Sequence, residues 1–347
     1  MKHLFTIVMI IAGFAIISDV SAEKPVNVED PAVNPIRDGN EMLASPEFKR
    51  DLTREFNVSS MPALTIKNEF GSINIKEGSD DKIIFRITIT GKGKNSNLAK
   101  EYAQTANVDF IQNGSNITAK TVLKKLDCKN CGRNIDYEVT VPRKIKLTLD
   151  NKFGNINLNN MSEPIEVQIS FGKLYANILS DANIKVQHGG FTINKCDNIT
   201  ISSDFSNNKV GEAGSVSGRV SHGGIDFEEL GGAELKLGFS NVNIRNLKKS
   251  FVANDFSHGS LIINNIDYDF SEIKINANFA KVRVLFNENH SFKAALYCNF
   301  GNIRTGKVVF HEKTLDKRDA FVGVAGKMKE PSSIVDISNS HGNINLE

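Results

Sequence analysis

The sequence predicts an all-β protein, a β-solenoid in which short coils stack in the manner of a parallel β-helix. Three observations predict this fold. One short motif recurs in a single register, apolar and polar residues alternate around each copy, and helix-forming segments and proline become rare after Lys144. Units this short cannot bury an apolar face alone, but they can do so by stacking on their neighbours.

The motif is an aromatic or histidine anchor, a small residue, one free position, and two mostly apolar residues separated by a polar one. The segments "NKFGNINL", "VSHGGIDF" and "NSHGNINL" are examples. The anchors are Phe70, Phe153, Phe171, His188, Phe205, His222, Phe239, His258, Phe279, Phe300 and His341. From Phe153 to Phe300 they are 17 to 21 residues apart, and the last gap, 341 − 300 = 41 residues, is about two repeats long.

Apolar residues occupy every second position before an anchor, as in Ile165, Val167 and Ile169. Positions three and five after the anchor are again apolar, so the buried parity shifts by one residue at the anchor. The chain must bend or bulge there, and a glycine or serine tolerates such a bend. Each unit is therefore predicted to be two short strands joined by a corner. An antiparallel sandwich is the structural alternative, but it would show hairpin turns and irregular strands.

The length of one coil is either one unit or two. The anchors alternate between phenylalanine and histidine from Phe171 to His258. A one-unit coil therefore stacks phenylalanine on histidine, whereas a two-unit coil stacks like on like. We favour one unit per coil, because ~17–25 residues suits a compact solenoid repeat.

The N-terminal part is predicted to be an export signal and a leader. Residues 1–22 have the pattern of a secretory signal peptide, with a basic start, an apolar run from Leu4 to Ile17 and small residues before the cleavage point. That run is shorter than the ~20 residues of a spanning helix. Residues 23–50 contain four prolines and are predicted to be a flexible leader. The mature chain is expected in the periplasm or at the cell surface.

The folded part is predicted to have two regions. Residues 51–145 form a small β-rich module with one short helix at "NLAKEYAQTA", and residues 146–347 form the solenoid array. A charged stretch at 306–331 is predicted to be an inserted loop or hairpin.

The four cysteines predict no metal site. Cys128 and Cys131 in "LDCKNCGRN" have zinc-site spacing, but no second pair of ligands follows. In an oxidising compartment a local disulfide between them is more typical. Cys196 and Cys298 are expected to be free core thiols, and no cofactor is predicted.

The composition and motifs argue against most enzymes and against nucleic-acid binding. The net charge is only +2, and no phosphate loop, nucleophile elbow, dinucleotide fingerprint or HExxH is present. Among the outward positions two and four after the anchors, Asp226 is the only carboxylate. A polysaccharide-processing β-helix, which needs paired carboxylates, remains the alternative function. The outward asparagines are expected to form side-chain ladders along the stack.

The histidine anchors are interpreted as rings that fill an aromatic slot, on the core-facing parity or at the corner, with a ring nitrogen bonded to a corner carbonyl. A third hypothesis is an envelope-stress or metal-sensing role, which would need two stacked histidines to share a metal.

The units "FGSINI", "FGNINL" and "HGNINL", the entry segment "REFNVSSMPALTIKN" and the signal peptide resemble the putative-adhesin β-strand-repeat families of bacterial envelopes. These include auto-transporter adhesin head and GIN-like domains. The resemblance extends from about residue 54 to the end, and the CxxC and the insert after Phe300 fall outside it. It implies an exported, surface-associated, non-enzymatic adhesin-like or envelope-scaffold protein. The implied partner is an unidentified envelope or extracellular ligand, a glycan or a protein.

Overall fold

A computed structural model describes residues 45–59, 61–78 and 80–347, and it has the predicted solenoid fold. In these ranges the chain forms twenty strands and one helix. The predicted signal peptide and residues 23–44 of the leader lie outside the described residues. Strand β1 (Glu47–Asn57) begins inside the segment that was assigned to the leader, so Glu47–Arg50 belong to the folded part.

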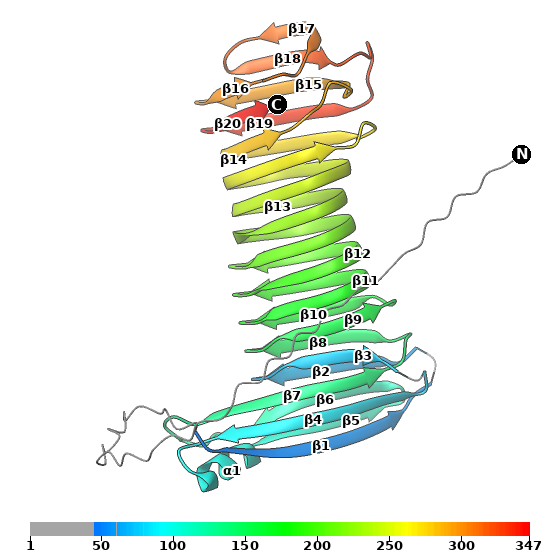
Figure 1. Ribbon diagram of the computed structural model, residues 1–347, viewed down its shortest axis with the longest axis vertical. Helices are drawn as coiled ribbons and strands as arrows, with labels where there is room; N and C mark the ends of the chain where they lie inside the picture. Colours follow the sequence, from blue (N-terminus) through cyan, green and yellow to red (C-terminus); the bar gives the residue numbers. More distant parts are fainter. Residues whose placement is uncertain (1–44, 60, 79) are drawn as a thin grey trace, which may run out of the picture. The chain divides into compact units, whose positions relative to one another are not determined.

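The coils stack by parallel pairing with one unit per coil (Figure 1). Ile165 pairs with Leu147 on one side and with Ala182 on the other, and these partners are 18 and 17 residues away. Ala182 pairs in turn with Ile199. The prediction of one unit per coil is therefore confirmed. The strands of this stack are β8 (Lys146–Lys152), β9 (Ile156–Met161), β10 (Ile165–Ser170), β11 (Lys173–Gln187), β12 (Gly190–Asp204), β13 (Asn207–Ile266) and β14 (Glu272–Val284).

The chain leaves sequence order at the C-terminal end of the stack. Strand β19 (Ile334–Ser340) pairs with β14 on one side and with β15 (Phe292–Asn299) on the other. Strand β20 (Asn343–Leu346) likewise pairs with β14 and with β16 (Asn302–Arg304). The last unit therefore lies between two units that precede it in the sequence. The 41-residue gap allows this return, because it contains a segment that leaves the stack.

That segment is a hairpin that covers the outermost coil. Strand β18 (Ala320–Ala325) pairs antiparallel with β15 and with β17 (Phe310–Asp316). Both strands lie within the insert at 306–331 that the sequence assigned to a loop or hairpin.

The N-terminal end is covered by a larger insert between the first and second units. Strands β2 (Ala63–Glu69) and β3 (Ile73–Glu77) form the first coil, which pairs with β8 and β9 on one face and with β6 and β7 on the other. Antiparallel pairs β7–β4, β4–β1 and β5–β6 complete this cap. Its remaining elements are β4 (Lys82–Lys92), α1 (Ser96–Gln104), β5 (Ala106–Asn113), β6 (Asn116–Leu123) and β7 (Gly132–Val141).

Helix α1 lies almost where the sequence predicted it. The side chain of Asn95 accepts a hydrogen bond of 2.8 Å from the Leu98 N–H and so caps the N-terminus. Ala99 and Ala103 are buried, and an added Cβ on Gly91 would lie 2.2 Å from the Ala99 carbonyl oxygen. Small residues therefore allow the helix to approach β4 closely.

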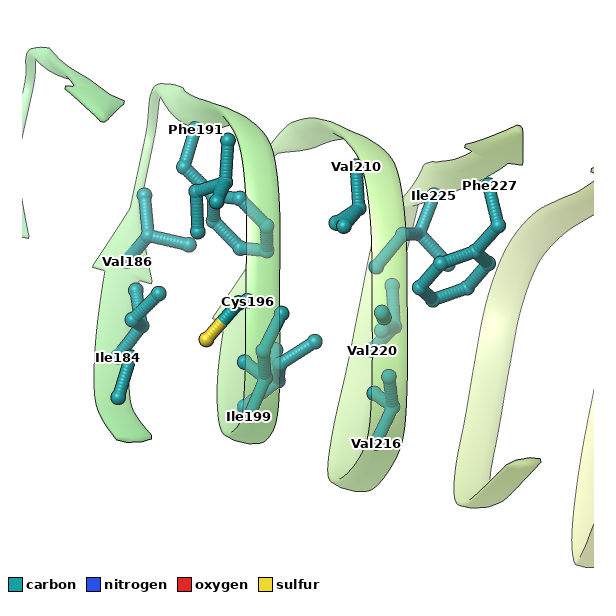
Figure 2. Close-up of a cluster of buried hydrophobic side chains, with 14 of the residues drawn as sticks. Ile184, Val186, Phe191, Cys196, Ile199, Val210, Val216, Val220, Ile225 and Phe227 are labelled. Carbon is teal, nitrogen blue, oxygen red and sulfur yellow. The ribbon is translucent and has the colours of Figure 1, made fainter. Parts of the chain in front are cut away.

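The core consists of rows of apolar side chains that repeat from coil to coil (Figure 2). Ile184, Val186 and Ile199 are buried and point into the interior of the coils. Alternate residues such as Glu166 and Gln168 are exposed. Each coil thus buries one side of each strand against its neighbours, as the period-two alternation predicts.

Candidate functional site: the aromatic column and its ends

All eleven anchors have a left-handed backbone conformation, with φ between +50° and +64°. This conformation is uncommon for bulky residues and costs about 1–2 kcal/mol per residue. It provides the corner that the parity shift predicted. Because the same conformation recurs at every unit, other contacts of the corner must offset its cost.

The residue after each anchor is glycine, serine or alanine in all eleven units. A Cβ on Gly172 would lie 1.9 Å from the carbonyl oxygen of Gly154 in the adjacent coil. The same distance separates a Cβ on Gly154 from the Gly71 carbonyl oxygen. At these glycines even a single Cβ would clash with the neighbouring corner unless the backbone moved.

The anchor rings stack face to face in one row, which we call the aromatic column. Neighbouring ring centroids are 4.5–5.1 Å apart, and the ring planes differ by 6–14°. This spacing follows from the ~4.8 Å between hydrogen-bonded strands. Because the last unit lies between the units of β14 and β15, His341 lies between Phe279 and Phe300. Phenylalanine and histidine therefore alternate without a break from Phe171 to Phe300.

The rings lie outside the core. Phe171 and Phe239 are 52% and 56% exposed, although their faces are covered by neighbouring rings, so the column presents ring edges to solvent. The histidines occupy the aromatic slot, as interpreted from the sequence. The expected bond to a corner carbonyl is wrong. Among the described residues, the ring nitrogens of His188, His222 and His258 have no hydrogen-bond partner, and His341 Nδ1 lies 2.9 Å from Ser340 Oγ.

Buried donors two residues before some anchors support the corners from inside. Asn151 Nδ2 donates a 2.9 Å hydrogen bond to the Gly71 carbonyl, and Asn339 Nδ2 donates one of 2.8 Å to the Ala280 carbonyl. Cys298 Sγ has the same role, 3.0 Å from the Gly342 carbonyl oxygen. The sequence reasoning missed these residues, although polar side chains on the apolar parity were a signal for them.

The N-terminal end of the column is closed by strand β7. The Ile135 N–H donates to the Phe70 carbonyl over 2.6 Å, and Asn68 Nδ2 donates to the Ile135 carbonyl over 3.0 Å. Asn134 therefore takes the place that the next anchor would have. Phe70 is half-buried as a result.

The C-terminal end of the column is open. Phe300 stacks on His341 with one face only and is 83% exposed, compared with 46–56% for the phenylalanines from Phe153 to Phe279. A cleft of about 600 Å³ lies beside this end of the column. It is lined by Phe300, Asn302, Arg318 and Asp319, and by His341, Gly342 and Asn343 of the adjacent coil.

The sequence matches the Toastrack DUF4097 family model over residues 61–347. The chain belongs to this family.

Several solved structures match this Toastrack chain at low identity. A putative lipid binding protein from Parabacteroides distasonis is 14% identical, with a TM-score of 0.36, over 86% of this chain and 96% of that one. A putative adhesin from Bacteroides fragilis is 11% identical, with a TM-score of 0.33, over 86% and 97%. A putative adhesin from Parabacteroides merdae is 16% identical, with a TM-score of 0.30, over 68% and 96%. No curated protein matches the sequence.

The outward faces of the Toastrack coils carry asparagine ladders, the longer of which lies outside the positions two and four for which the sequence predicts them. Asn177 Nδ2 donates to Asn160 Oδ1 over 2.8 Å, and Asn194 Nδ2 donates to Asn177 Oδ1 over 3.0 Å. This ladder lies six or seven residues after the anchors. Asn157, four residues after its anchor, forms a further step with Asn74 over 2.6 Å.

Two acids of the outward faces, Glu166 and Asp204, have neutral or basic neighbours in the adjacent coils. Glu166 pairs in register with Thr148 and Asn183. Asp204 pairs with Gln187 and Ser221, and its Oδ2 accepts a hydrogen bond of 2.8 Å from Arg219. Neither acid therefore forms the carboxylate pair that glycoside hydrolysis uses.

The histidine anchors are separated by phenylalanine rings, so consecutive rings never offer two imidazoles to one metal. In the described ranges, no group of three or more His, Cys, Asp or Glu is placed to hold a metal ion. None of the described helices has the length and hydrophobicity of a membrane span.

The structure joins Cys128 and Cys131 in a disulfide between β6 and β7. Cys196 and Cys298 are free and buried. Burial raises the pKa of Cys196 to about 12 and also raises the pKa of Cys298, so both thiols are neutral at physiological pH.

Proposed function

We propose that this Toastrack protein is exported and acts without catalysis, as an adhesin-like or scaffold protein that binds a ligand of the cell envelope. The signal peptide, the location in the periplasm or at the cell surface, and the likeness to auto-transporter adhesin heads and GIN-like domains are parts of this proposal. The ligand is a glycan or a protein of the envelope.

The observation that carries the proposal is the exposure of the aromatic column. Five phenylalanines from Phe153 to Phe279 each expose about half of their surface along one line of corners. A contiguous exposed apolar surface on a folded protein typically marks an interaction site. The rings are also held in place on both faces, so little side-chain entropy remains to be lost when a ligand binds.

The experiment has an export arm and a binding arm. The full chain is expressed in its source organism and the cells are fractionated; we expect a shortened chain in the envelope or periplasmic fraction. The purified chain is then sedimented with isolated cell envelopes, and we expect saturable binding. Retention of the uncleaved chain in the cytosol, or binding that does not saturate, would contradict the proposal.

Two variants test whether the column is the binding surface. The triple variant Phe171→His, Phe205→His and Phe239→His keeps a ring at every corner but makes the line polar, and we expect envelope binding to weaken several-fold. Ile178→Ser is the matched control, because Ile178 is 43% exposed but lies outside the column. Equal binding by both variants and the unmodified chain would exclude the column as the site.

A further inference from the structure

Phe300 differs from every other phenylalanine of the column in having an uncovered face. Its extra exposure, 83% against 46–56% for the phenylalanines from Phe153 to Phe279, corresponds to the missing neighbour, since its contact with His341 at 4.7 Å is like the others. Ring faces elsewhere in the column are covered. Phe300 is therefore the place where a ligand can stack on the column instead of touching ring edges.

The open face lies beside a turn that carries both a positive and a negative side chain. The backbone holds this turn in place, because the Cys298 N–H donates to the Asp319 carbonyl over 2.8 Å and the Ile303 N–H donates to the Arg318 carbonyl over 3.3 Å. Arg318 Nε donates to Asn302 Oδ1 over 3.0 Å. In the described part of the chain, the Arg318 Nη groups and the Asp319 carboxylate have no protein partner.

A sugar ring fits this combination of groups. The C–H face of a pyranose is apolar and stacks on the negative face of an aromatic ring, while its hydroxyls both donate and accept hydrogen bonds. Arg318 offers donors and Asp319 offers acceptors at the edge of the cleft. The cleft of about 600 Å³ is within the size range of small-ligand sites.

We propose that the open face of Phe300, with Arg318, Asp319 and Asn302, binds one ring of a neutral glycan. The proposal rests on the proposed function and names the chemical class of the envelope ligand. A neutral ligand is favoured because the charges of Arg318 and Asp319 offset each other. A cation would be attracted by Asp319 but repelled by Arg318. An acidic sugar would be attracted by Arg318 but repelled by Asp319.

The chain contains no tryptophan, so Phe300→Trp adds a single fluorescent reporter at the proposed platform. The variant is titrated with cellohexaose, mannohexaose and hexa-N-acetylchitohexaose as neutral probes, with an oligogalacturonate as the acidic probe and choline as the cationic probe. We expect a saturable emission change with one neutral probe and a Kd of about 1 mM or below. Phe239→Trp is the matched control, because both ring faces are covered there, and its emission should not respond.

Further variants are measured by calorimetry with the responding probe. Phe300→Ala should weaken binding about tenfold or more, because it removes the stacking face. Asp319→Asn should change the affinity by less than about threefold, because an amide still accepts hydrogen bonds from hydroxyls. Binding of choline that is lost in Asp319→Asn would overturn the proposal in favour of a cation site, and a response to no neutral probe would overturn it outright.

The two proposals fail differently. If no sugar binds but Phe300→Ala still sediments with envelopes as the unmodified chain does, the sugar site is wrong and the envelope-binding function stands. If the unmodified chain does not bind envelopes at all, the proposed function is wrong whatever the sugar titrations show.

Discussion

The two ends of the aromatic column differ in what the chain places beyond the last ring. Beyond Phe70, strand β7 continues both the hydrogen bonds and the side-chain rows, and Asn134 fills the next anchor position. Beyond Phe300, the Arg318–Asp319 turn continues only the hydrogen bonds. One end is thus closed to ligands, while the other presents a ring face.

This difference shows that the backbone ladder and the side-chain column of a repeated stack are terminated separately. Unpaired strand edges promote association with other chains, and both caps cover the backbone of the terminal coil. Strand β18 pairs antiparallel with β15 at the C-terminal end, whereas β6 and β7 pair parallel with the first coil at the N-terminal end. The side-chain column is terminated independently of the backbone. A cap can therefore protect the sheet and still leave a binding surface at its end.

The largest effect is expected from a side chain added at a corner glycine, because the backbones of adjacent coils approach one another closely there. In Gly172→Val the new Cβ would lie 1.9 Å from the Gly154 carbonyl oxygen, so the free energy of unfolding should fall by about 3–4 kcal/mol or more. Gly132→Val is the control, because the nearest atom to its Cβ is 3.9 Å away. Urea unfolding followed by circular dichroism compares the two, and equal loss would show that the corners are not closely packed.

The next effect compares the buried donors near the two ends. Asn151→Ala removes the partner of the Gly71 carbonyl and should cost about 2–3 kcal/mol. Cys298→Ala removes a weaker donor from the Gly342 carbonyl and should cost about 1 kcal/mol. Chemical denaturation of both variants measures the difference in their free energies of unfolding. A larger loss of stability in Cys298→Ala than in Asn151→Ala would contradict this ranking of the two donors.

A sequence-based derivation can explain the repeat but not the ends. The 17-residue spacing favours one unit per coil, because this length suits a compact repeat, whereas the alternation of Phe and His fits either coil length. Aromatic anchors suggest core residues, and only the corner conformation turns their rings outward. The return of His341 between Phe279 and Phe300 and the approach of Arg318 to Phe300 are long-range contacts, which a gap of 41 residues does not define.

A smaller effect should separate a middle ring from the terminal ring. Phe239→Ala removes two stacking contacts and Phe300→Ala removes one, while the backbone conformation at both sites is the same. At about 0.5–1.5 kcal/mol per aromatic pair, Phe239→Ala should be less stable than Phe300→Ala by about 1 kcal/mol. Thermal and urea unfolding test this, and equal stabilities would mean that the second stacking contact contributes nothing.

The smallest effect concerns Cys196, which is buried in a middle coil and has a pKa of about 12. Above the ordinary thiol pKa of about 8.5, the unfolded chain releases this proton while the folded chain keeps it, so stability falls as the pH rises. Between pH 7 and pH 9 this thiol should lower the free energy of unfolding by about 0.8 kcal/mol, and Cys196→Ala should abolish that contribution. Unfolding curves at pH 7 and pH 9 give the difference, and the same pH dependence in both proteins would contradict the assignment.

The difference between the ends is tested most directly by the accessibility of single tryptophans placed at each end. Phe70→Trp and Phe300→Trp each introduce the only tryptophan of the chain. Acrylamide quenching should be several-fold more efficient for Phe300→Trp, because that position is 83% exposed whereas Phe70 is half-buried beside strand β7. Equal quenching at the two positions would show that the column is not open at its C-terminal end.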